Sequence, residues 1–145
     1  MADCLLIDQN VLLDVLLERM PHFTESALVV ELIAEDHVEG FLSGASVDTM
    51  VYLLATHHTP ARINGILRFV RLKFKIAPIT ESIIDDSLAT GWKDVEDAIV
   101  YQSAKSAGCT VVITRNVKDF KTKGSDGPLV MTPKEYLAFR STRSL

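Results

Sequence analysis

The chain has 145 residues, of which 48% are hydrophobic and 23% charged, and its formal net charge at pH 7 is -4. These values are typical of a globular domain that buries its own core without disulfides or structural metals, so we expect a single domain over residues 1–145. No apolar run reaches the roughly 18 to 20 residues of a membrane-spanning helix, and Met1-Ala2-Asp3 lacks the pattern of a signal peptide. We therefore expect a cytoplasmic protein with no membrane partner.

Hydrophobic periodicity divides the chain into alternating strands and helices. Short apolar runs predict five strands, at residues 5–8, 40–43, 74–79, 110–114 and 129–131. Helical spacing and capping residues predict seven helical segments: 10–19, one opened by His22 or Thr24, one capped by Ser46, Pro60–Leu72, one capped by Thr80, Asp94–Gly108, and one begun by Pro133. Strands that alternate with helices predict an α/β fold with a mostly parallel five-stranded sheet, covered by helices on both faces.

Acidic and polar side chains stand where predicted strands end. Asp8 closes the first strand, while Asn116 and Asp119 follow the fourth strand, which ends at Thr114. A third acid, Asp97, lies one turn into the helix that begins at Asp94. If the first and fourth strands are neighbours in the sheet, these groups converge on one pocket at the carboxyl ends of the strands.

Converging carboxylates predict a metal centre. Two carboxylates about 4 Å apart repel each other by several kcal/mol at an effective dielectric near 20, so a proton or cation must join them. Mg²⁺ or Mn²⁺ is the ion that such a carboxylate site is expected to bind, and a bound ion of this kind supports phosphodiester hydrolysis. The expected metal ligands are Asp8, Asp97 and Asp119, with Asn116 as a further catalytic candidate. Each acid also has a structural use: Asp8 could cap a helix, and Asp119 could close a turn.

The cations are concentrated in one acid-free segment. Between Thr49 and Thr80 there is no Asp or Glu, and five cations fall there: Arg62, Arg68, Arg71, Lys73 and Lys75. On the predicted helix Pro60–Leu72, Arg68 and Arg71 lie opposite the apolar stripe. This face is either a surface that binds phosphates or an ordinary solvated helix face.

Three further residues are candidates for substrate binding. Asn10 either orients Asp8 or a metal-bound water, or caps a helix. Thr114 either donates a hydrogen bond to a carboxylate or phosphate, or simply ends its strand. Arg115 either meets a phosphate or is an exposed loop residue with no specific contact.

Three sequence blocks resemble those of the PIN-domain ribonucleases, a family that includes the toxins of VapBC toxin–antitoxin pairs. The blocks are residues 6–14 (LIDQNVLLD), 94–98 (DVEDA) and 112–120 (VITRNVKDF), in the family's order and across nearly the whole chain. The resemblance implies a three-layer α/β/α sandwich with a central parallel sheet and a Mg²⁺ or Mn²⁺ site. It also implies an endoribonuclease that cleaves single-stranded RNA, forms homodimers and binds a small antitoxin.

Two departures from the family pattern keep other functions open. Thr49 stands where many active members carry Glu, and Asn116 stands where some carry Asp. A non-catalytic PIN-like module that binds RNA or a protein is therefore the main alternative. A receiver-like or phosphatase-like domain with Asp8 as phosphoryl acceptor is a third. It lacks support because Asp8-Gln9-Asn10 is not an Asp-x-Asp motif and no lysine follows the fifth strand at Met131-Thr132, before Pro133.

Overall fold

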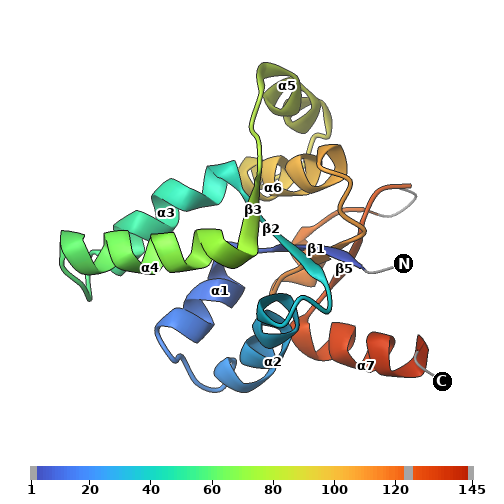
Figure 1. The fold of residues 1–145 in the computed structure, drawn as a ribbon. Helices are drawn as coiled ribbons and strands as arrows, with labels where there is room; N and C mark the ends of the chain where they lie inside the picture. The colour runs from blue at the N-terminus through green and yellow to red at the C-terminus, as the bar shows by residue number, and fades with distance from the viewer. Residues whose placement is uncertain (1–2, 123–125, 144–145) are drawn as a thin grey trace.

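The structure is a computed structural model that describes residues 3–122 and 126–143 (Figure 1). Five strands form one sheet in the order β3-β2-β1-β4-β5, and all four pairings are parallel. The strands are β1 (Cys4–Ile7), β2 (Glu39–Ser43), β3 (Phe74–Ala77), β4 (Val111–Ile113) and β5 (Leu129–Met131). The predicted five-stranded sheet is confirmed, and it is wholly rather than mostly parallel.

Helices cover both faces of this sheet, as Figure 1 shows. They are α1 (Gln9–Leu16), α2 (Phe23–Ala34), α3 (Gly44–Leu54), α4 (Pro60–Lys73), α5 (Glu81–Ala89), α6 (Val95–Ser106) and α7 (Pro133–Arg143), with a short 3-10 turn η1 (Val117–Asp119). Because successive side chains of a strand point to opposite faces, Leu5 and Ile7 pack with α1, α2 and α7, whereas Leu6 packs with α6. The three-layer α/β/α sandwich is therefore confirmed.

Several predicted boundaries were wrong for local reasons. The first helix ends at Leu16, not Arg19, because Glu18 adopts a left-handed backbone with φ of 50°. The third strand stops at Ala77 rather than residue 79, since Pro78 has no backbone N–H for the ladder. Ser43, not Ser46, caps α3: its Oγ accepts a hydrogen bond of 3.3 Å from the backbone N–H of Ala45.

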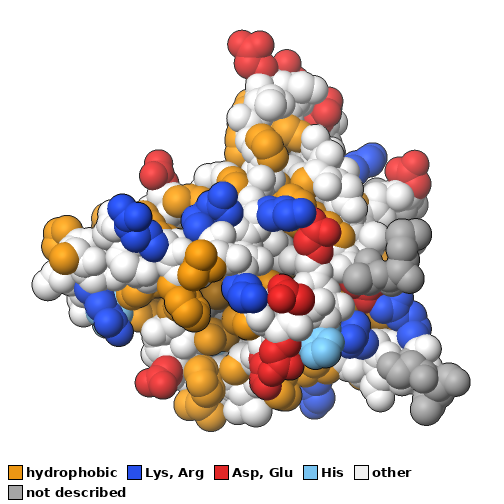
Figure 2. All heavy atoms as spheres, in the orientation of Figure 1, with side chains coloured by type: hydrophobic (Ala, Val, Ile, Leu, Met, Phe, Trp, Pro, Cys, Tyr) orange, Lys and Arg blue, Asp and Glu red, His pale blue; other side chains and the backbone are white. Residues whose placement is uncertain are grey.

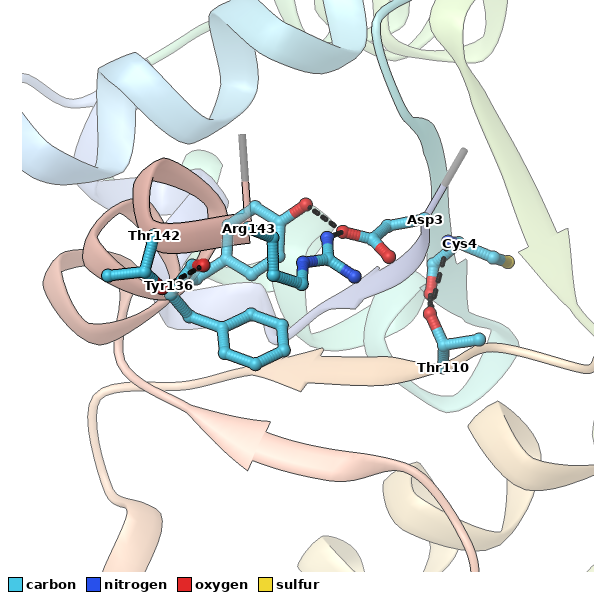
Figure 3. A network of polar contacts seen from close by, with 7 residues as sticks. Asp3, Cys4, Thr110, Tyr136, Thr142 and Arg143 are labelled. Carbon is cyan, nitrogen blue, oxygen red and sulfur yellow. Dashed lines mark hydrogen bonds and ion pairs between the residues drawn. The ribbon is translucent and has the colours of Figure 1, made fainter. Parts of the chain in front are cut away.

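The last helix is tied to the first strand through one carboxylate. Figure 3 shows Tyr136 and Arg143 of α7 both directed at Asp3, which immediately precedes β1. The Tyr136 hydroxyl donates to Asp3 Oδ2 at 2.6 Å, and the Arg143 guanidinium contacts the same oxygen. This contact joins the two ends of the described chain. None of the helices in the described ranges is long and apolar enough to cross a bilayer.

Candidate active site at the carboxyl ends of the strands

Asp8 lies at the carboxyl end of β1, beside the end of β4. Its backbone N–H donates to the carbonyl of Ile113 at 2.9 Å, and its Oδ2 accepts a hydrogen bond of 2.8 Å from Thr114 Oγ1. The first and fourth strands are therefore neighbours, which is the condition under which the sequence analysis expects these acids to converge. Asp8 occupies the residue before α1, yet within the described chain its side chain makes no capping hydrogen bond there. The carboxylate is therefore directed to β4 rather than used as a helix cap.

The Asp8 carboxyl group is buried in a mainly unfavourable electrostatic setting. Burial is the largest effect and raises its pKa above the ordinary value of 3.8. The hydrogen bond from Thr114 and the backbone N–H of Gln9 act in the opposite direction, whereas the negative charge of Glu96 raises the pKa further. A positive ion at this point would relieve both the desolvation and the repulsion.

Asp97 is the residue whose carboxyl group interacts electrostatically with the other acids of this region. It is half-buried in the first turn of α6, and its backbone N–H donates to Asp94 Oδ1 at 3.2 Å. Burial, followed by the charges of Asp94, Asp8 and Asp119, raises the pKa of Asp97 to about 7. Because such charge effects fall off with distance, these carboxylates share one region of the surface.

The loop after β4 brings Asp119 to the same region. Thr114 Oγ1 accepts a hydrogen bond of 3.2 Å from the backbone N–H of Asn116, and the carbonyl of Asn116 accepts one of 3.0 Å from the N–H of Asp119. Both Asn116 and Asp119 are exposed. Asp119 also lines a cavity of about 540 Å³, together with Lys93, Asp94, Val95 and Lys121. The structure thus brings together Asp8, Thr114, Asp97, Asp119 and Asn116.

Sequence reasoning overlooked two lysines at this cavity, Lys93 and Lys121. Each is an exposed lysine in a loop, which in sequence alone carries no functional signal. Asp94, at which the sequence predicts the helix to begin, caps α6. Its proximity to Asp97 gives it a second, electrostatic effect on the site.

Arg115 is anchored by an acid that sequence reasoning did not select. Its Nε lies 3.1 Å from Oδ2 of Asp14, a fully buried residue of α1, whose Oδ1 is 2.9 Å from Arg19 Nε. Neither contact is aligned as a hydrogen bond, so the attraction is mainly Coulombic. Arg19 Nη2 also donates to the carbonyl of Asn10 at 3.0 Å. The available signal was a lone carboxylate inside the apolar run 11–17.

The basic helix forms as predicted, but its end lies away from the acids. Ile63 and Val70 of α4 are buried, while Arg68 and Arg71 are exposed, and Figure 2 shows blue cations interspersed with orange apolar side chains over α4. Arg71 Nη1 donates to the carbonyl of Phe74 at 2.6 Å, at the amino end of β3. Asp8 lies at the carboxyl end of β1, which runs parallel to β3. Arg71 therefore lies at the opposite ends of the strands, the amino ends.

The acidic side chains offer only oxygen ligands, which are those that Mg²⁺ and Mn²⁺ prefer. Across residues 3–122 and 126–143, however, no group of three or more His, Cys, Asp or Glu side chains is already gathered closely enough to hold an ion. The carboxylates of the site therefore suit Mg²⁺ or Mn²⁺ in ligand type and in charge, although they are not yet arranged around an ion. Binding requires a carboxylate to move inward or to coordinate through water.

Comparisons with known proteins agree with this fold. A sequence model of the PIN domain matches residues 4–118. Ribonuclease VapC1 of Aquifex aeolicus (strain VF5) is 22% identical over 135 residues, which are 90% of each chain. A toxin–antitoxin complex from Klebsiella pneumoniae contains a chain with 27% identity and a TM-score of 0.66, covering 88% of this chain and 96% of that one. A chain of VapBC-1 from nontypeable Haemophilus influenzae has 15% identity and a TM-score of 0.65, covering 90% and 98%.

Proposed function

This chain belongs to the PIN-domain family, and on that premise we propose that it is a metal-dependent endoribonuclease that cleaves single-stranded RNA as the toxin of a toxin–antitoxin pair. The observation that carries the proposal is the placement of Asp8 beside the end of β4, where Thr114 holds it by a 2.8 Å hydrogen bond, near Asp97 at the start of α6. The charges of Asp94, Asp8 and Asp119 all raise the pKa of Asp97, so four acids crowd one region at the carboxyl ends of the strands. The ribonuclease name of a relative with 22% identity supports the same reaction.

Asp8, Asp97 and Asp119 are the proposed ligands of Mg²⁺ or Mn²⁺. When bound, the ion supplies a polarised phosphoryl oxygen and a water of lowered pKa. Thr114 holds the Asp8 carboxylate in place through its 2.8 Å hydrogen bond. Asn116, which is linked to Thr114 through its backbone, presents its amide from the same loop. The role of the protein is to place these groups before substrate arrives.

Cations beside the acids are the proposed RNA contacts. Lys93 and Lys121 line the same cavity as Asp119, so they can neutralise phosphates on either side of the cleavage point. Arg68 remains a candidate for more distant phosphates, and it donates to Asn64 Oδ1 at 2.7 Å on the exposed face of α4. The placement of Arg71 at the amino ends of the strands makes it the weaker candidate.

Protein partners are proposed from the relatives and from exposed apolar side chains. Tyr52, Phe69 and Leu72, on α3 and α4, are 75%, 70% and 77% exposed. Exposed apolar side chains that form one contiguous patch commonly mark an interaction surface. We propose that an antitoxin and a second copy of the chain are the partners, as the toxin–antitoxin complexes among the structural relatives suggest.

Cleavage of a fluorophore-labelled single-stranded RNA tests the proposal. The wild-type protein with Mn²⁺ should cut the RNA, and EDTA should stop the reaction. Asp97→Asn should lower the rate at least 100-fold while leaving RNA binding largely intact, whereas Asp48→Asn, an exposed acid on α3, should have no effect. Equal cleavage by wild type and Asp97→Asn would rule out the proposed site.

A non-catalytic RNA-binding module is the second candidate. Thr49 on α3, and the lack of an already gathered ligand set among the described residues, favour it. RNA that is bound in the presence of Mn²⁺ and left uncut would establish this alternative. Membership of the PIN-domain family removes the receiver-like interpretation of Asp8.

A further inference from the structure

A second cavity of about 320 Å³ lies where α2 and α7 begin. Figure 1 shows these helices side by side, with α7 in red, below the sheet. Pro21 and Pro133 supply rigid apolar surface, and Arg115, Lys134 and Glu25 supply charge. His22 and Thr132 complete the wall near the helix ends. None of the acids at the carboxyl end of β1 or on α6 lines this cavity.

We propose that this cavity binds one nucleotide of a single-stranded RNA, next to the cleavage point. Its base or sugar would lie against Pro21 and Pro133, and its phosphate would lie between Arg115 and Lys134. A pocket with mainly apolar walls and a few convergent polar groups suits a small planar ligand. This inference rests on the proposed ribonuclease function, because it assigns a subsite for the same substrate.

The charges around the cavity favour an anion. Two cations, Arg115 and Lys134, and one acid, Glu25, line the cavity, so the lining itself carries one net positive charge. The buried Asp14 beside Arg115, and Glu135, whose carboxylate accepts a 2.9 Å hydrogen bond from the backbone N–H of Thr132, reduce this positive potential. Helix α2 also begins without a side-chain cap among the described residues, so the amides of its first turn add a positive potential.

Ser26 provides an independent indication of a polar ligand. Its side chain is fully buried, it lines the cavity, and its Oγ has no hydrogen-bond partner among the residues that the structure describes. A buried hydroxyl without a partner is costly, and buried polar atoms in native proteins are usually paired. Because Ser26 has an exposed fraction of 0%, a ribose hydroxyl or a polar base atom would become its partner only if the cavity wall shifts on binding.

The cavity is close enough to the acids to share one RNA chain with them. Arg115 directly follows Thr114, whose hydroxyl contacts Asp8. The side chains of these two residues point in different directions, because that of Thr114 contacts Asp8 while that of Arg115 contacts Asp14 on α1. Two consecutive residues therefore border the carboxylate site and the cavity, one on each side. A nucleotide held there would orient the neighbouring phosphate towards Asp8.

Binding of adenosine 5′-monophosphate, adenosine and inorganic phosphate to the full chain tests the subsite. Calorimetry or ligand-observed NMR is performed with EDTA present, so that no metal recruits phosphate to the acids. The monophosphate should bind more tightly than adenosine or phosphate alone. Lys134→Ala should weaken binding of the monophosphate about tenfold and leave the affinity for adenosine unchanged, since only the contact with the phosphate is lost. Ser26→Ala should weaken adenosine and monophosphate alike.

Lys105→Ala is the matched control, because Lys105 is a similarly exposed lysine of α6 that pairs with Asp126 instead. Equal losses in Lys105→Ala and Lys134→Ala would overturn the subsite in favour of nonspecific attraction. Failure of all three ligands to bind the wild type would also overturn it, as would tighter binding of an acidic peptide than of the monophosphate.

RNA kinetics separate this inference from the proposed function. Lys134→Ala should raise KM about tenfold with kcat unchanged, because the phosphate contact exists before and during cleavage. If RNA is cut and Lys134→Ala has the wild-type KM, the subsite is wrong and the ribonuclease function stands. If RNA is never cut but Lys134→Ala still weakens monophosphate binding, the cavity is a nucleotide site and the ribonuclease function is wrong.

Discussion

Thr114 Oγ1 donates a 2.8 Å hydrogen bond to Asp8 Oδ2 and accepts a 3.2 Å bond from the backbone N–H of Asn116. One fully buried hydroxyl therefore holds the carboxylate at the end of β1 and the loop at the end of β4. Positioning groups of this kind are commonly needed for full activity even though they do not react.

Replacement of Thr114 by Val should impair cleavage by about 10- to 100-fold. The buried Asp8 carboxylate loses a donor that lowers its pKa, so its pKa should rise further and the pH–rate profile should move to higher pH. Thr110→Val is the control, because Thr110 lies at the other end of the same strand and its hydroxyl contacts the backbone of Cys4. An unshifted pH profile for Thr114→Val would contradict the role assigned to its hydroxyl.

Mn²⁺ or Mg²⁺ should raise the melting temperature of the wild-type protein. An ion that binds the native state alone stabilises it by about 2.7 kcal/mol at a concentration 100 times its Kd. Asp8→Asn should abolish this rise and should leave the metal-free protein as stable as the wild type or more so, because repulsion is relieved. Differential scanning calorimetry with and without the ion measures both effects. An equal rise in wild type and Asp8→Asn would exclude Asp8 as a ligand.

Without metal, Asp97 should make the protein less stable as the pH rises from about 4 to 7. Its folded pKa of about 7 lies above its unfolded value of 3.8. A raised carboxyl pKa contributes stability below pH 3.8, and that contribution disappears as the pH rises through the folded pKa. Asp97→Asn should therefore increase the unfolding free energy by about 1 to 2 kcal/mol at pH 8, after discounting for solvent screening. Urea denaturation at pH 5 and 8 should show the gain mainly at pH 8.

Asp14→Asn should destabilise the protein by about 3 kcal/mol. The substitution leaves Arg19 and Arg115 facing each other without the buried carboxylate between them. Chemical denaturation measures the loss, and Asp48→Asn, at an exposed position, should stay within about 0.5 kcal/mol of wild type. A second change, Arg115→Met, should restore part of the stability in Asp14→Asn. If Arg115→Met restores no stability, repulsion between Arg115 and Arg19 is not the cause of the loss in Asp14→Asn.

Tyr136→Phe should loosen α7 and cost about 1 to 1.5 kcal/mol. Burial raises the pKa of Asp3, but the hydrogen bonds from Tyr136 and Arg143 outweigh burial and hold that pKa below 3.8. The resulting stability is present above the unfolded pKa and is lost as the pH falls through the folded pKa. Denaturation between pH 2 and 5 should therefore show a weaker acid dependence in Tyr136→Phe. Tyr52→Phe, at a position 75% exposed, should match the wild type.

The order of strands and helices could be predicted from the sequence because each element carries its own local signal. Leu5, Leu6 and Ile7 form a continuous apolar run since β1 is buried on both faces, and Pro60 and Thr59 mark the start of α4. Asp8 could be singled out because its place after a buried strand is visible in one dimension. Helix ends such as Leu16 were less predictable, because the left-handed backbone of Glu18 leaves no mark in the residue pattern.

Only the tertiary structure decided which charges act on one another. From the sequence, Arg115 could be an exposed loop residue, but α1 places Asp14 beside it. Arg71 could belong to a substrate-binding surface, but its contact with Phe74 places it at the amino ends of the strands, away from the acids. Residues 14 and 115 are 101 positions apart, and Coulombic energy depends on their separation in space rather than along the chain. The sequence alone thus determined the elements and the acids at their ends, while packing determined which partner each charge met.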